Sequence, residues 1–572
     1  MSAARPGFGG PARVASRDVP KPVAASIPIG SVASAARAGT AGTAATAGPA
    51  TTLGALAREL GITLGGSDAG TPVAGISLAS DRIGPGEVFA ALPGASRHGA
   101  DFAAAAVTAG AVAVLTDPAG AARLAAGPQV TVPVLVVADP RAVVGGLAAH
   151  LAGDPALSMT VFAVTGTSGK TTTSYLLEAG LRAAGQRPGV IGTTGTRIDG
   201  DPVPSALTTP EAPDLHQLLA RMAACDVRAV AVEVSSHALV LHRVDGLVAD
   251  VALFTNLSRD HLDFHGDMAS YLAAKLLLFT PRHARAAVVC LDDGPDGYGV
   301  AVAVAARAAG LPTVTVATRA EAVAADWSRS AVVPDWSVPS ISPVGVGGSR
   351  FTVVAPEGRE HAGRIRLAGS FNVANAVLAL AALHTAGIDT SVALSGMAEL
   401  AGVPGRLERV GNGSPMAFVD YAHKPDALEA VLTQVRGMLA PGGRLGVVLG
   451  AGGDRDRGKR ALMGAVAARL ADLLVLTDDN PRGEDPATIR AEVRAGAQQV
   501  KATDRAPGRG LVDLVEIGDR RAAIAHAVAA LGQGDVLVVA GKGAETGQQI
   551  AGTTFPFDDR VVVAEQLMSA HA

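Results

Sequence analysis

VFAVTGTSGKTTTSYLLEAGLRAAG, residues 161–185, joins an apolar run, a glycine-rich turn and an amphipathic run. VFAV is typical of a buried strand, and the leucines that follow the turn recur at helical spacing. A strand, a glycine loop and a helix in this order point backbone N–H groups at one place, where a polyphosphate can bind. The residues predicted to bind a nucleotide there are Gly166, Thr167, Ser168, Gly169, Lys170, Thr171 and Thr172.

Within this loop, Lys170 is expected to reach the outer phosphates and Thr171 to hold Mg²⁺ through its hydroxyl. The usual P-loop has a glycine five residues before Gly169, but Val164 stands there and the first glycine is Gly166. The loop is therefore a shortened variant, GxxGKT. A chance GKT between two apolar segments is the alternative, and the flanking strand and helix favour nucleotide binding.

The composition bounds the class of protein. A chain of 572 residues is long enough for three or four domains. Its 48 Lys and Arg against 52 Asp and Glu give a net charge of −4, which argues for neither a nucleic acid nor an anionic membrane as partner. Two cysteines suit a reducing compartment, and no apolar run reaches the roughly 18 residues of a membrane span. We expect a soluble cytoplasmic monomer.

Changes in composition predict the domain boundaries. Residues 1–50 are Ala, Gly, Pro, Ser and Thr with scattered Arg, which favours a disordered tail over a transit peptide. Residues 51–155 are expected to form a small α/β domain, residues 156–400 a central domain, and residues 401–572 a third domain.

Strand and helix patterns alternate through the second and third segments. RAVAVEV, DVALFTNL and AAVVCL in the second, and MAFVDYA, RLGVVLGAGG, ADLLVLTDD and DVLVVAGKG in the third, have the apolar character of buried strands. The fold class is therefore α/β, with two doubly wound, mostly parallel sheets. Ligands of such sheets bind beyond the carboxyl ends of the strands.

Acidic and imidazole side chains follow two of these strands. Glu233 ends AVAVEV, where it is placed for Mg²⁺, although an ordinary strand-end acid is the alternative. After DVALFTNL, the run DHLDFH brings Asp260, His261, Asp263 and His265 into six residues, which favours a metal or phosphate role. Lys275 lies in an apolar helical stretch, where a surface lysine with a buried stem is the simple interpretation.

Several motifs in order resemble one family. GTSGKTT, EVSSHAL, NLSRDHLDFHGDMASYLAAK, GSFNVANA, GRLE, DYAHKPD and DNPR are similar to motifs of the Mur ligases, and the resemblance covers the chain from about residue 50 to its end. It implies a three-domain architecture, with a substrate-binding N-terminal domain, a central P-loop-type sheet that binds ATP, and a Rossmann-like C-terminal domain that binds an amino acid.

The resemblance also implies roles for single residues. Lys275 matches a lysine that carbon dioxide carbamylates, which makes it an anion that can hold Mg²⁺ together with Thr171, Glu233 and His261. The catalytic set is Lys170, Lys275, Glu233 and His261. Asn375, Arg406 and Asp420 match ATP contacts. The positions that match contacts to UDP-N-acetylmuramoyl-L-Ala-D-Glu are Ser80, Thr208, Thr209, Ser235 and Arg243.

The implied reaction is ATP-dependent amide formation through an acyl phosphate, in peptidoglycan precursor synthesis. Arg482 after one strand and Arg455 on a neighbouring loop suit a ligand rich in carboxylates, and Glu545 suits an ammonium. meso-Diaminopimelate fits, and DNPR is the family's diaminopimelate motif. The predicted amino-acid site comprises Arg455, Asp479, Asn480, Pro481, Arg482, Gly541 and Glu545.

Departures from the family pattern leave alternatives open. Ser168 replaces an Asn, the uridine-site DSR triplet reads ASD around Ser80, Leu241 replaces a substrate-contacting Gln, and Ala544 replaces the His of GKGHE. Leu241 and Ala544 put those two contacts in doubt. The alternatives are addition of L-lysine, another Mur-like ligase such as a folylpolyglutamate synthetase, or a relative that binds nucleotide or muramoyl peptide without catalysis.

Overall fold

The structure is a computed structural model, and it describes residues 51–570 apart from 95, 129, 204–206, 329, 331, 345–346, 412, 506–509 and 511. The predicted tail, residues 1–50, lies outside the described residues. All described residues belong to one compact unit, Thr46–Ala572. In this part of the chain, no helix combines the length and the apolar character that a membrane crossing needs.

The N-terminal region is built around a four-stranded parallel sheet in the order β3-β4-β5-β6. The first helix, α1, has the sequence LGALARE, and the side chain of Thr52 caps its N-terminus. The elements are β1 (Thr51–Thr52), α1 (Leu53–Glu59), β2 (Pro72–Val73), β3 (Gly75–Ser77), β4 (Glu87–Ala91), α2 (Ala103–Thr108), β5 (Ala113–Thr116), α3 (Pro118–Ala126), β6 (Val134–Val136) and α4 (Pro140–Leu151).

The central region contains one sheet of eleven strands, in the order β10-β9-β8-β11-β7-β12-β13-β14-β15-β16-β17. Its elements are β7 (Thr160–Thr165), α5 (Lys170–Ala183), β8 (Pro188–Gly192), β9 (Gly195–Ile198), β10 (Asp201–Val203), α6 (Ala212–Ala224), β11 (Ala229–Glu233), α7 (Ser236–Val240), β12 (Val251–Phe254), α8 (Leu262–His265), α9 (Met268–Leu276), β13 (Ala287–Cys290), α10 (Tyr298–Ala308), β14 (Thr313–Ala317), α11 (Ala320–Val323), β15 (Trp336–Val344), β16 (Gly348–Val354), β17 (Glu360–Ile365), α12 (Ser370–Thr385) and α13 (Thr390–Glu399).

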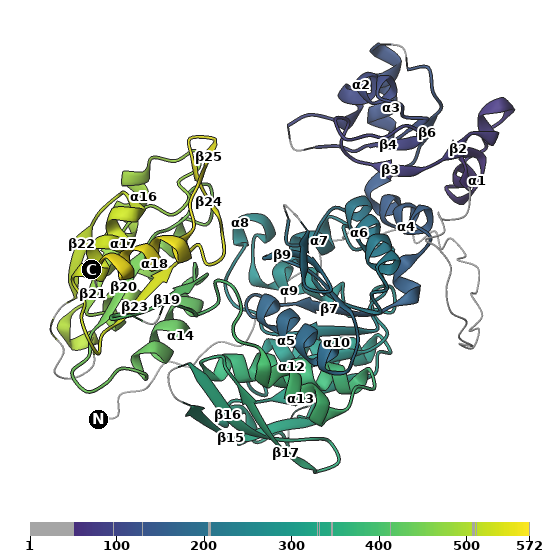
Figure 1. Cartoon of the computed structure of the whole chain (residues 1–572). Helices are drawn as coiled ribbons and strands as arrows, with labels where there is room; N and C mark the ends of the chain where they lie inside the picture. The colour runs from purple at the N-terminus through teal and green to yellow at the C-terminus, as the bar shows by residue number, and fades with distance from the viewer. Residues whose placement is uncertain are drawn as a thin grey trace, which may run out of the picture. The chain divides into compact units, whose positions relative to one another are not determined.

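Helices cover both faces of this sheet. Successive residues of β7 point to opposite sides, because side chains alternate along a strand. Phe162 belongs to the core that α5, α12 and α13 cover, whereas Val161 and Ala163 belong to the core on the α6 and α10 side. Figure 1 shows α5 and α12 close together against the sheet. The doubly wound α/β prediction is confirmed, and β7 lies between β11 and β12 in parallel register.

One end of the central sheet was not predicted from the sequence. β15, β16 and β17 continue the sheet as an antiparallel meander, and β17 is its last strand. Their buried residues alternate with exposed Ser, Arg and Glu, because one face packs on α12 while the other faces solvent. The apolar runs that mark fully buried parallel strands are therefore missing here.

The C-terminal region contains a six-stranded sheet in the order β18-β19-β23-β20-β21-β22, parallel except for β18. All four predicted strands are present, as β19, β20, β21 and β23. The elements are β18 (Glu408–Val410), β19 (Met416–Asp420), α14 (Pro425–Arg436), β20 (Leu445–Leu449), α15 (Gly458–Leu470), β21 (Leu473–Leu476), α16 (Pro486–Gln498), β22 (Asp513–Glu516), α17 (Arg520–Ala529), β23 (Val536–Ala540), β24 (Gly547–Ile550), β25 (Thr553–Pro556) and α18 (Asp559–Ala570).

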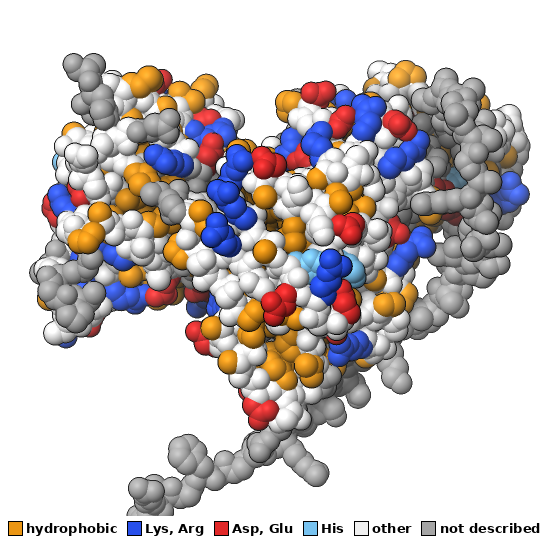
Figure 2. Space-filling view, turned by 60° about the horizontal axis from the view of Figure 1, so that its bottom comes forward, with side chains coloured by type: hydrophobic (Ala, Val, Ile, Leu, Met, Phe, Trp, Pro, Cys, Tyr) orange, Lys and Arg blue, Asp and Glu red, His pale blue; other side chains and the backbone are white. Residues whose placement is uncertain are grey.

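Charges of both signs are mixed on the surface. Figure 2 shows Lys and Arg side chains interspersed with Asp and Glu side chains over the face that it draws. This agrees with the net charge of −4.

A buried ion pair joins two helices of the C-terminal region. Arg520 and Asp559 are both 0% exposed, and the guanidinium donates to the carboxylate at 2.8 and 2.7 Å. We expect Arg520→Met to lower the free energy of unfolding by about 3–5 kcal/mol, because Asp559 is left buried without its cation. The measurement is urea unfolding followed by circular dichroism.

The matched control is Arg521→Gln, one residue along, because Arg521 forms an ion pair with Glu565 at half-exposed positions. An exposed pair contributes about 0–1 kcal/mol, so this variant is expected to unfold like the wild type. An equal decrease in the free energy of unfolding in the two variants would contradict a structural role for the buried pair.

Candidate functional site

The loop between β7 and α5 needs both of its glycines. Gly166 has φ 147° and Gly169 has φ 88°, a region that favours glycine. A Cβ on Gly166 would lie 1.8 Å from Thr255 Oγ1, and a Cβ on Gly169 would lie 2.4 Å from Asn375 Oδ1. The loop thus brings its backbone close to the neighbouring strand end and to α12, and it leads directly into the N-terminus of α5.

Lys170, the first residue of α5, folds its side chain back over the loop. Its Nζ donates to the carbonyl oxygens of Gly166 at 2.8 Å and of Thr167 at 3.3 Å. Burial of the ammonium group and the nearby charge of Lys424 lower the pKa of Lys170 to about 8. An incoming anion would favour the charged form of this lysine.

A carboxylate and two threonines meet beside the loop. Glu233, at the end of β11, is 1% exposed and accepts from Thr171 Oγ1 at 3.1 Å and from Thr193 Oγ1 at 2.9 Å. Arg406, which precedes the C-terminal sheet, donates to Thr171 Oγ1 at 3.0 Å. The structure therefore brings the predicted residues Thr171, Glu233 and Arg406 together. Thr193 is a contributor that sequence patterns did not single out.

Asp260 and Lys424 form a second link between the central and C-terminal regions. Lys424 Nζ lies 2.7 Å from Asp260 Oδ2 and donates to the carbonyl oxygen of Thr167 at 3.2 Å. Burial would raise the pKa of Asp260, but Lys424 and the hydrogen bond from His261 outweigh it and hold that pKa well below its usual range. The motif DYAHKPD contained Lys424, but only the fold brings it to the phosphate loop.

His261 lies beside Asp260 and faces a second imidazole. Its Nε2 is 2.8 Å from Asp260 Oδ2, and its ring meets that of His237 edge to face at 4.9 Å. Burial lowers the pKa of His261, against the pull of Asp260, so the neutral ring is favoured. His265 takes a different role, because its Nε2 pairs with Ser236 Oγ at 2.9 Å and its ring stacks on Tyr271.

Lys275 is buried within α9. Its side chain is 1% exposed, and its Nζ lies 4.6 Å from the centre of the Tyr271 ring. Burial and the nearby charges of Lys170 and Lys424 hold the pKa of Lys275 well below its usual value. The surface-lysine interpretation is therefore wrong. Among the described residues, no three His, Cys, Asp or Glu side chains are grouped as metal ligands.

The residues predicted to contact the muramoyl peptide lie in two separate parts of the structure. Thr209 Oγ1 donates to the carbonyl oxygen of Glu233 at 2.8 Å and accepts from Ser235 N at 3.1 Å. Thr208 reaches the same strand end through Thr193, at 3.2 Å, and Arg243 donates to the Thr209 carbonyl oxygen at 3.5 Å. Ser80 belongs to the loop after β3, and within the described part of the chain no hydrogen bond joins it to this group.

Asn375 and Asp420 lie around the loop in different ways. Asn375, on α12, accepts from Thr173 Oγ1 at 3.4 Å and lies against Gly169. Asp420 accepts from the backbone N–H groups of Leu407 at 2.6 Å and Ala422 at 2.7 Å, and so fixes the chain next to Arg406. Burial raises the pKa of Asp420. Its direct partner in this structure is backbone.

A polar network occupies the carboxyl ends of β21 and β23. Lys542, whose side chain is 0% exposed, donates to Asn480 Oδ1 at 3.0 Å and to Glu545 at 3.2 Å. Asn480 Nδ2 donates to Glu545 at 2.8 Å, and Asp479 Oδ1 lies 3.6 Å from Lys542. Asn480, Asp479 and Glu545 were predicted from the sequence, whereas Lys542, which orients them, was not.

Arg482 and Arg455 lie on adjacent loops of this region. Arg482 has φ 54°, and its guanidinium donates to the carbonyl oxygen of Gly453 at 2.7 Å and to Gln549 Oε1 at 3.2 Å. Arg455 is exposed, three residues after Gly452, which itself borders Arg482. Pro481 is buried, and Gly541 (φ 114°) abuts Asp479. The predicted residues therefore lie on the loops that follow the carboxyl ends of β20, β21 and β23.

The two departures from the family pattern, Leu241 and Ala544, have different surroundings in the structure. Leu241 contributes a backbone contact: its carbonyl oxygen accepts a hydrogen bond from Arg141 at 3.1 Å. Ala544 lies where the chain crosses Gly405, whose Cβ would meet Ala544 N at 2.1 Å. Among the described residues, the side-chain partners of Lys170, Glu233 and Lys275 include neither Leu241 nor Ala544, and nothing in the structure explains the exchange of His by Ala.

Family models match most of the chain. The Mur ligase family catalytic domain matches residues 72–151, the Mur ligase middle domain matches residues 164–383, and the Mur ligase glutamate ligase domain matches residues 405–543. These three segments cover most of the three sheets that bear the predicted site residues.

Individual relatives extend the similarity to nearly full length. The UDP-N-acetylmuramoyl-L-alanyl-D-glutamate–2,6-diaminopimelate ligase of Streptomyces avermitilis is 49% identical over 519 residues, which are 91% of this chain and 96% of that protein. The ligase of the same name from Corynebacterium efficiens is 48% identical over 91% of this chain and 95% of its own. A solved structure of a ligase with this name has a TM-score of 0.61 and 32% identity, over 90% of this chain and 99% of its own.

Proposed function

The chain belongs to the Mur ligase family, and we propose that it is an ATP-dependent ligase that joins meso-diaminopimelate to UDP-N-acetylmuramoyl-L-Ala-D-Glu. The new amide forms at the side-chain carboxylate of D-glutamate. The observation that carries this proposal is that Arg406 and Lys424, from the C-terminal region, reach Thr171 and Thr167 of the phosphate loop. A triphosphate bound there lies within reach of cations from both regions.

The residues present fit a nucleotide and Mg²⁺. The two glycines let the loop pack closely against Thr255 and Asn375 as it enters α5, whose N-terminal N–H groups suit phosphate, and Lys170 supplies a cation. Thr171 and Glu233 offer a hydroxyl and a carboxylate, the oxygen ligands that Mg²⁺ prefers, and burial lowers the pKa of His261, which favours the neutral ring that a metal ligand needs. Bound Mg²⁺ would neutralise charge on the transferred phosphoryl group.

The chain's own residues position and shield the reaction. The substrate carboxylate attacks the γ-phosphorus of ATP, the bond to the β-phosphate breaks, and an acyl phosphate and ADP form. The amine of diaminopimelate then attacks its carbonyl carbon, an amide bond forms, and inorganic phosphate and a proton leave. Lys170 stabilises the phosphoryl oxygens, and the contacts of Arg406 and Lys424 exclude water from the acyl phosphate.

Lys275 is proposed to work as a carbamate. An amine whose pKa is strongly lowered is neutral and can attack carbon dioxide; an N–C bond forms and a proton is released. The product is an anion of carboxylate type. Three lysines, Lys170, Lys424 and Lys275, influence one another's charge in this region, so converting one of them to an anion relieves like-charge repulsion.

The C-terminal network is proposed to recognise the amino acid. Arg482 suits the distal carboxylate of meso-diaminopimelate, and Asn480 and Glu545 suit its distal ammonium. L-Lysine lacks the second carboxylate, so Arg482 keeps its neutral partners Gly453 and Gln549 but gains no anion to balance its charge. Lys542 holds Asn480 and Glu545 in place.

A specificity prediction follows. We expect Arg482→Gln to lower kcat/KM for meso-diaminopimelate by roughly 10²–10³-fold, because the variant loses a charged hydrogen bond to carboxylate. The preference over L-lysine is expected to shrink by a similar factor. Steady-state kinetics with both amino acids measure this, and Arg494→Gln, an exposed arginine paired with Glu516, is the control. An unchanged preference in Arg482→Gln would contradict the assigned role.

The lowered pKa of Lys170 predicts how ATP affinity depends on pH. At pH values above about 8, much of the free protein has a neutral Lys170, and bound phosphate favours the ammonium. Binding then takes up a proton, so affinity is expected to fall by up to about tenfold per pH unit above pH 8 and to be flat below about pH 7. Calorimetry in buffers of different ionisation enthalpy measures the proton uptake on ATP binding. No uptake at about pH 9 would contradict the lowered pKa assigned to Lys170.

The proposed reaction is tested by its dependence on substrates. Purified protein is mixed with ATP and Mg²⁺, and phosphate release is followed as the muramoyl dipeptide and the amino acid are added singly and together. The proposal expects release only with both. Nucleotide binding without phosphate release would favour the alternative suggested by Leu241 and Ala544, a relative that binds without catalysis.

We further propose that the protein acts as a cytoplasmic monomer in peptidoglycan precursor synthesis, and thereby serves cell shape and division. One chain supplies the phosphate loop and the amino-acid network, which supports the monomer. ATP as a substrate supports the cytoplasm. Light scattering in the presence of substrates checks the monomer.

A further inference from the structure

A second cavity lies at the far end of the central sheet, between the last strand β17, its neighbour β16, and helix α13. Its volume is about 500 Å³, which is in the range of small-molecule sites. β17 stands six strands from β7 in the order β7-β12-β13-β14-β15-β16-β17. At about 4.8 Å per strand this is roughly 29 Å from the phosphate loop, so the cavity is separate from the ligase site.

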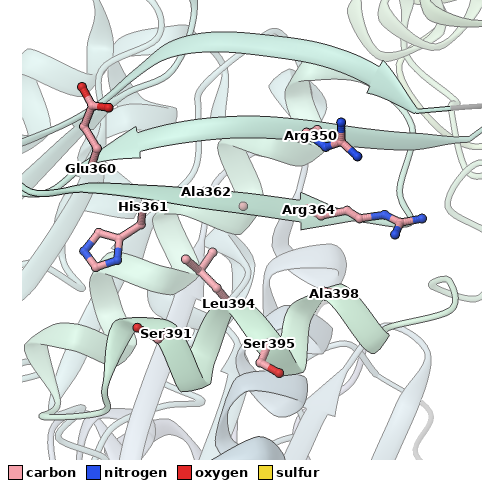
Figure 3. A pocket seen from close by; sticks show the side chains of 10 residues that line it. Arg350, Glu360, His361, Ala362, Arg364, Ser391, Leu394, Ser395 and Ala398 are labelled. Atoms are coloured by element: carbon pink, nitrogen blue, oxygen red, sulfur yellow. The ribbon is translucent and has the colours of Figure 1, made fainter.

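Two arginines face each other in this cavity. Arg350 of β16 and Arg364 of β17 are direct partners in the antiparallel register, and both are exposed. Figure 3 shows both side chains extending toward the same end of the strands. Among the described residues, neither guanidinium has an acidic partner within ion-pair distance. Like charges directly opposite each other destabilise a strand pair, and an anion bound between them would reverse that effect.

The remaining walls suit a small organic molecule. Ser391 and Ser395, four residues apart on α13, present hydroxyls on one face, and Leu394 lies between them. His361 lies at the opposite end of β17 from Arg364, and its Nε2 is buried without a hydrogen-bond partner.

We propose that this cavity binds a small phosphate-bearing molecule, with the phosphate between Arg350 and Arg364. A phosphate monoester carries nearly two negative charges, which match two guanidiniums, whereas one carboxylate carries a single charge. Because side chains alternate along β17, Arg364 lies on the face opposite His361, so the rest of the molecule passes the open edge of this last strand toward Leu394 and the serines of α13. The inference goes beyond the ligase activity and does not depend on it.

The test is calorimetric titration of the full-length protein with inorganic phosphate and with glycerol 3-phosphate, with ADP and Mg²⁺ saturating the phosphate loop. We expect both probes to bind, and Arg350→Gln/Arg364→Gln to weaken them at least about tenfold. The control is Arg366→Gln/Arg494→Gln, which removes the same charge from two arginines already paired with Glu399 and Glu516. It is expected to bind the probes as the wild type does.

Three results would overturn the proposal: no binding of either probe at about 10 mM, equal binding by wild type and the Arg350/Arg364 variant, or equal weakening in the control. Succinate binding as tightly as glycerol 3-phosphate would overturn the phosphate assignment in favour of a carboxylate. The Arg350/Arg364 variant is expected to keep its full rate of ligase-dependent phosphate release, which keeps this test apart from that of the ligase site.

Discussion

Lys170→Met is expected to lower kcat by at least about 10³-fold while the protein still folds. Methionine keeps the length of the side chain but removes the ammonium that now donates to Gly166 and Thr167. In the reaction this ammonium would turn to the phosphoryl oxygens, where charge develops during transfer. Loss of a positioned cation therefore acts on the transition state more than on ATP binding.

The measurement is phosphate release under saturating substrates, with far-UV circular dichroism as the check on folding. Lys501→Met is the control, since Lys501 is exposed and lies in the C-terminal region. A rate for Lys170→Met within about tenfold of the wild type would contradict the role given to this residue.

Lys275→Ala is expected to lower the rate by roughly 10²–10³-fold or more, because the proposed carbamate supplies an anionic ligand that alanine lacks. Folding is expected to persist, since the buried lysine packs on the Tyr271 ring and, among the described residues, its removal leaves no hydrogen-bond or ion-pair partner unsatisfied. Rates are measured with and without added bicarbonate. The wild type is expected to slow when carbon dioxide is removed and to recover with bicarbonate.

A readout apart from activity separates the carbamate from a general effect of the substitution. ¹³C-labelled carbon dioxide is expected to give a carbamate signal in the NMR spectrum of the wild type and none in that of Lys275→Ala. A wild-type protein without this signal, or a fully active Lys275→Ala, would remove the carbamate from the mechanism.

Local sequence predicted the parts of the site that local structure builds. The phosphate loop follows from VFAVTGTSGKTT, because a strand, two glycines and a helix N-terminus are all encoded within a dozen residues. Glu233 and Asn480 could be placed at the ends of strands for the same reason. Each of them sits at a strand end in the structure, with partners at hydrogen-bond distance.

Contacts between distant segments could not be predicted in this way. Arg406 meets Thr171 across 235 positions of sequence, and Lys424 meets Thr167 across 257. The periodicity of apolar residues does not indicate which distant segments meet, because these contacts depend on how the two sheets pack. The same reason explains why Lys542 was missed: its importance lies in being buried beneath Asn480 and Glu545.

The antiparallel end of the central sheet was missed for a different reason. β16 and β17 each bury one face only, so their sequences mix Arg350, Arg364 and Glu360 with Phe351 and Ile365. Short amphipathic strands of this kind give weak sequence signals. This is also the segment that forms the second cavity.

The central claim is that this chain joins meso-diaminopimelate to the muramoyl dipeptide. The most direct measurement offers equal concentrations of meso-diaminopimelate and L-lysine, with ATP, Mg²⁺ and UDP-N-acetylmuramoyl-L-Ala-D-Glu, and identifies the product by mass spectrometry. We predict the diaminopimelate adduct in excess of roughly a thousandfold, because lysine provides no carboxylate for the Arg482 guanidinium. A product containing lysine, or no product from either amino acid, would contradict it.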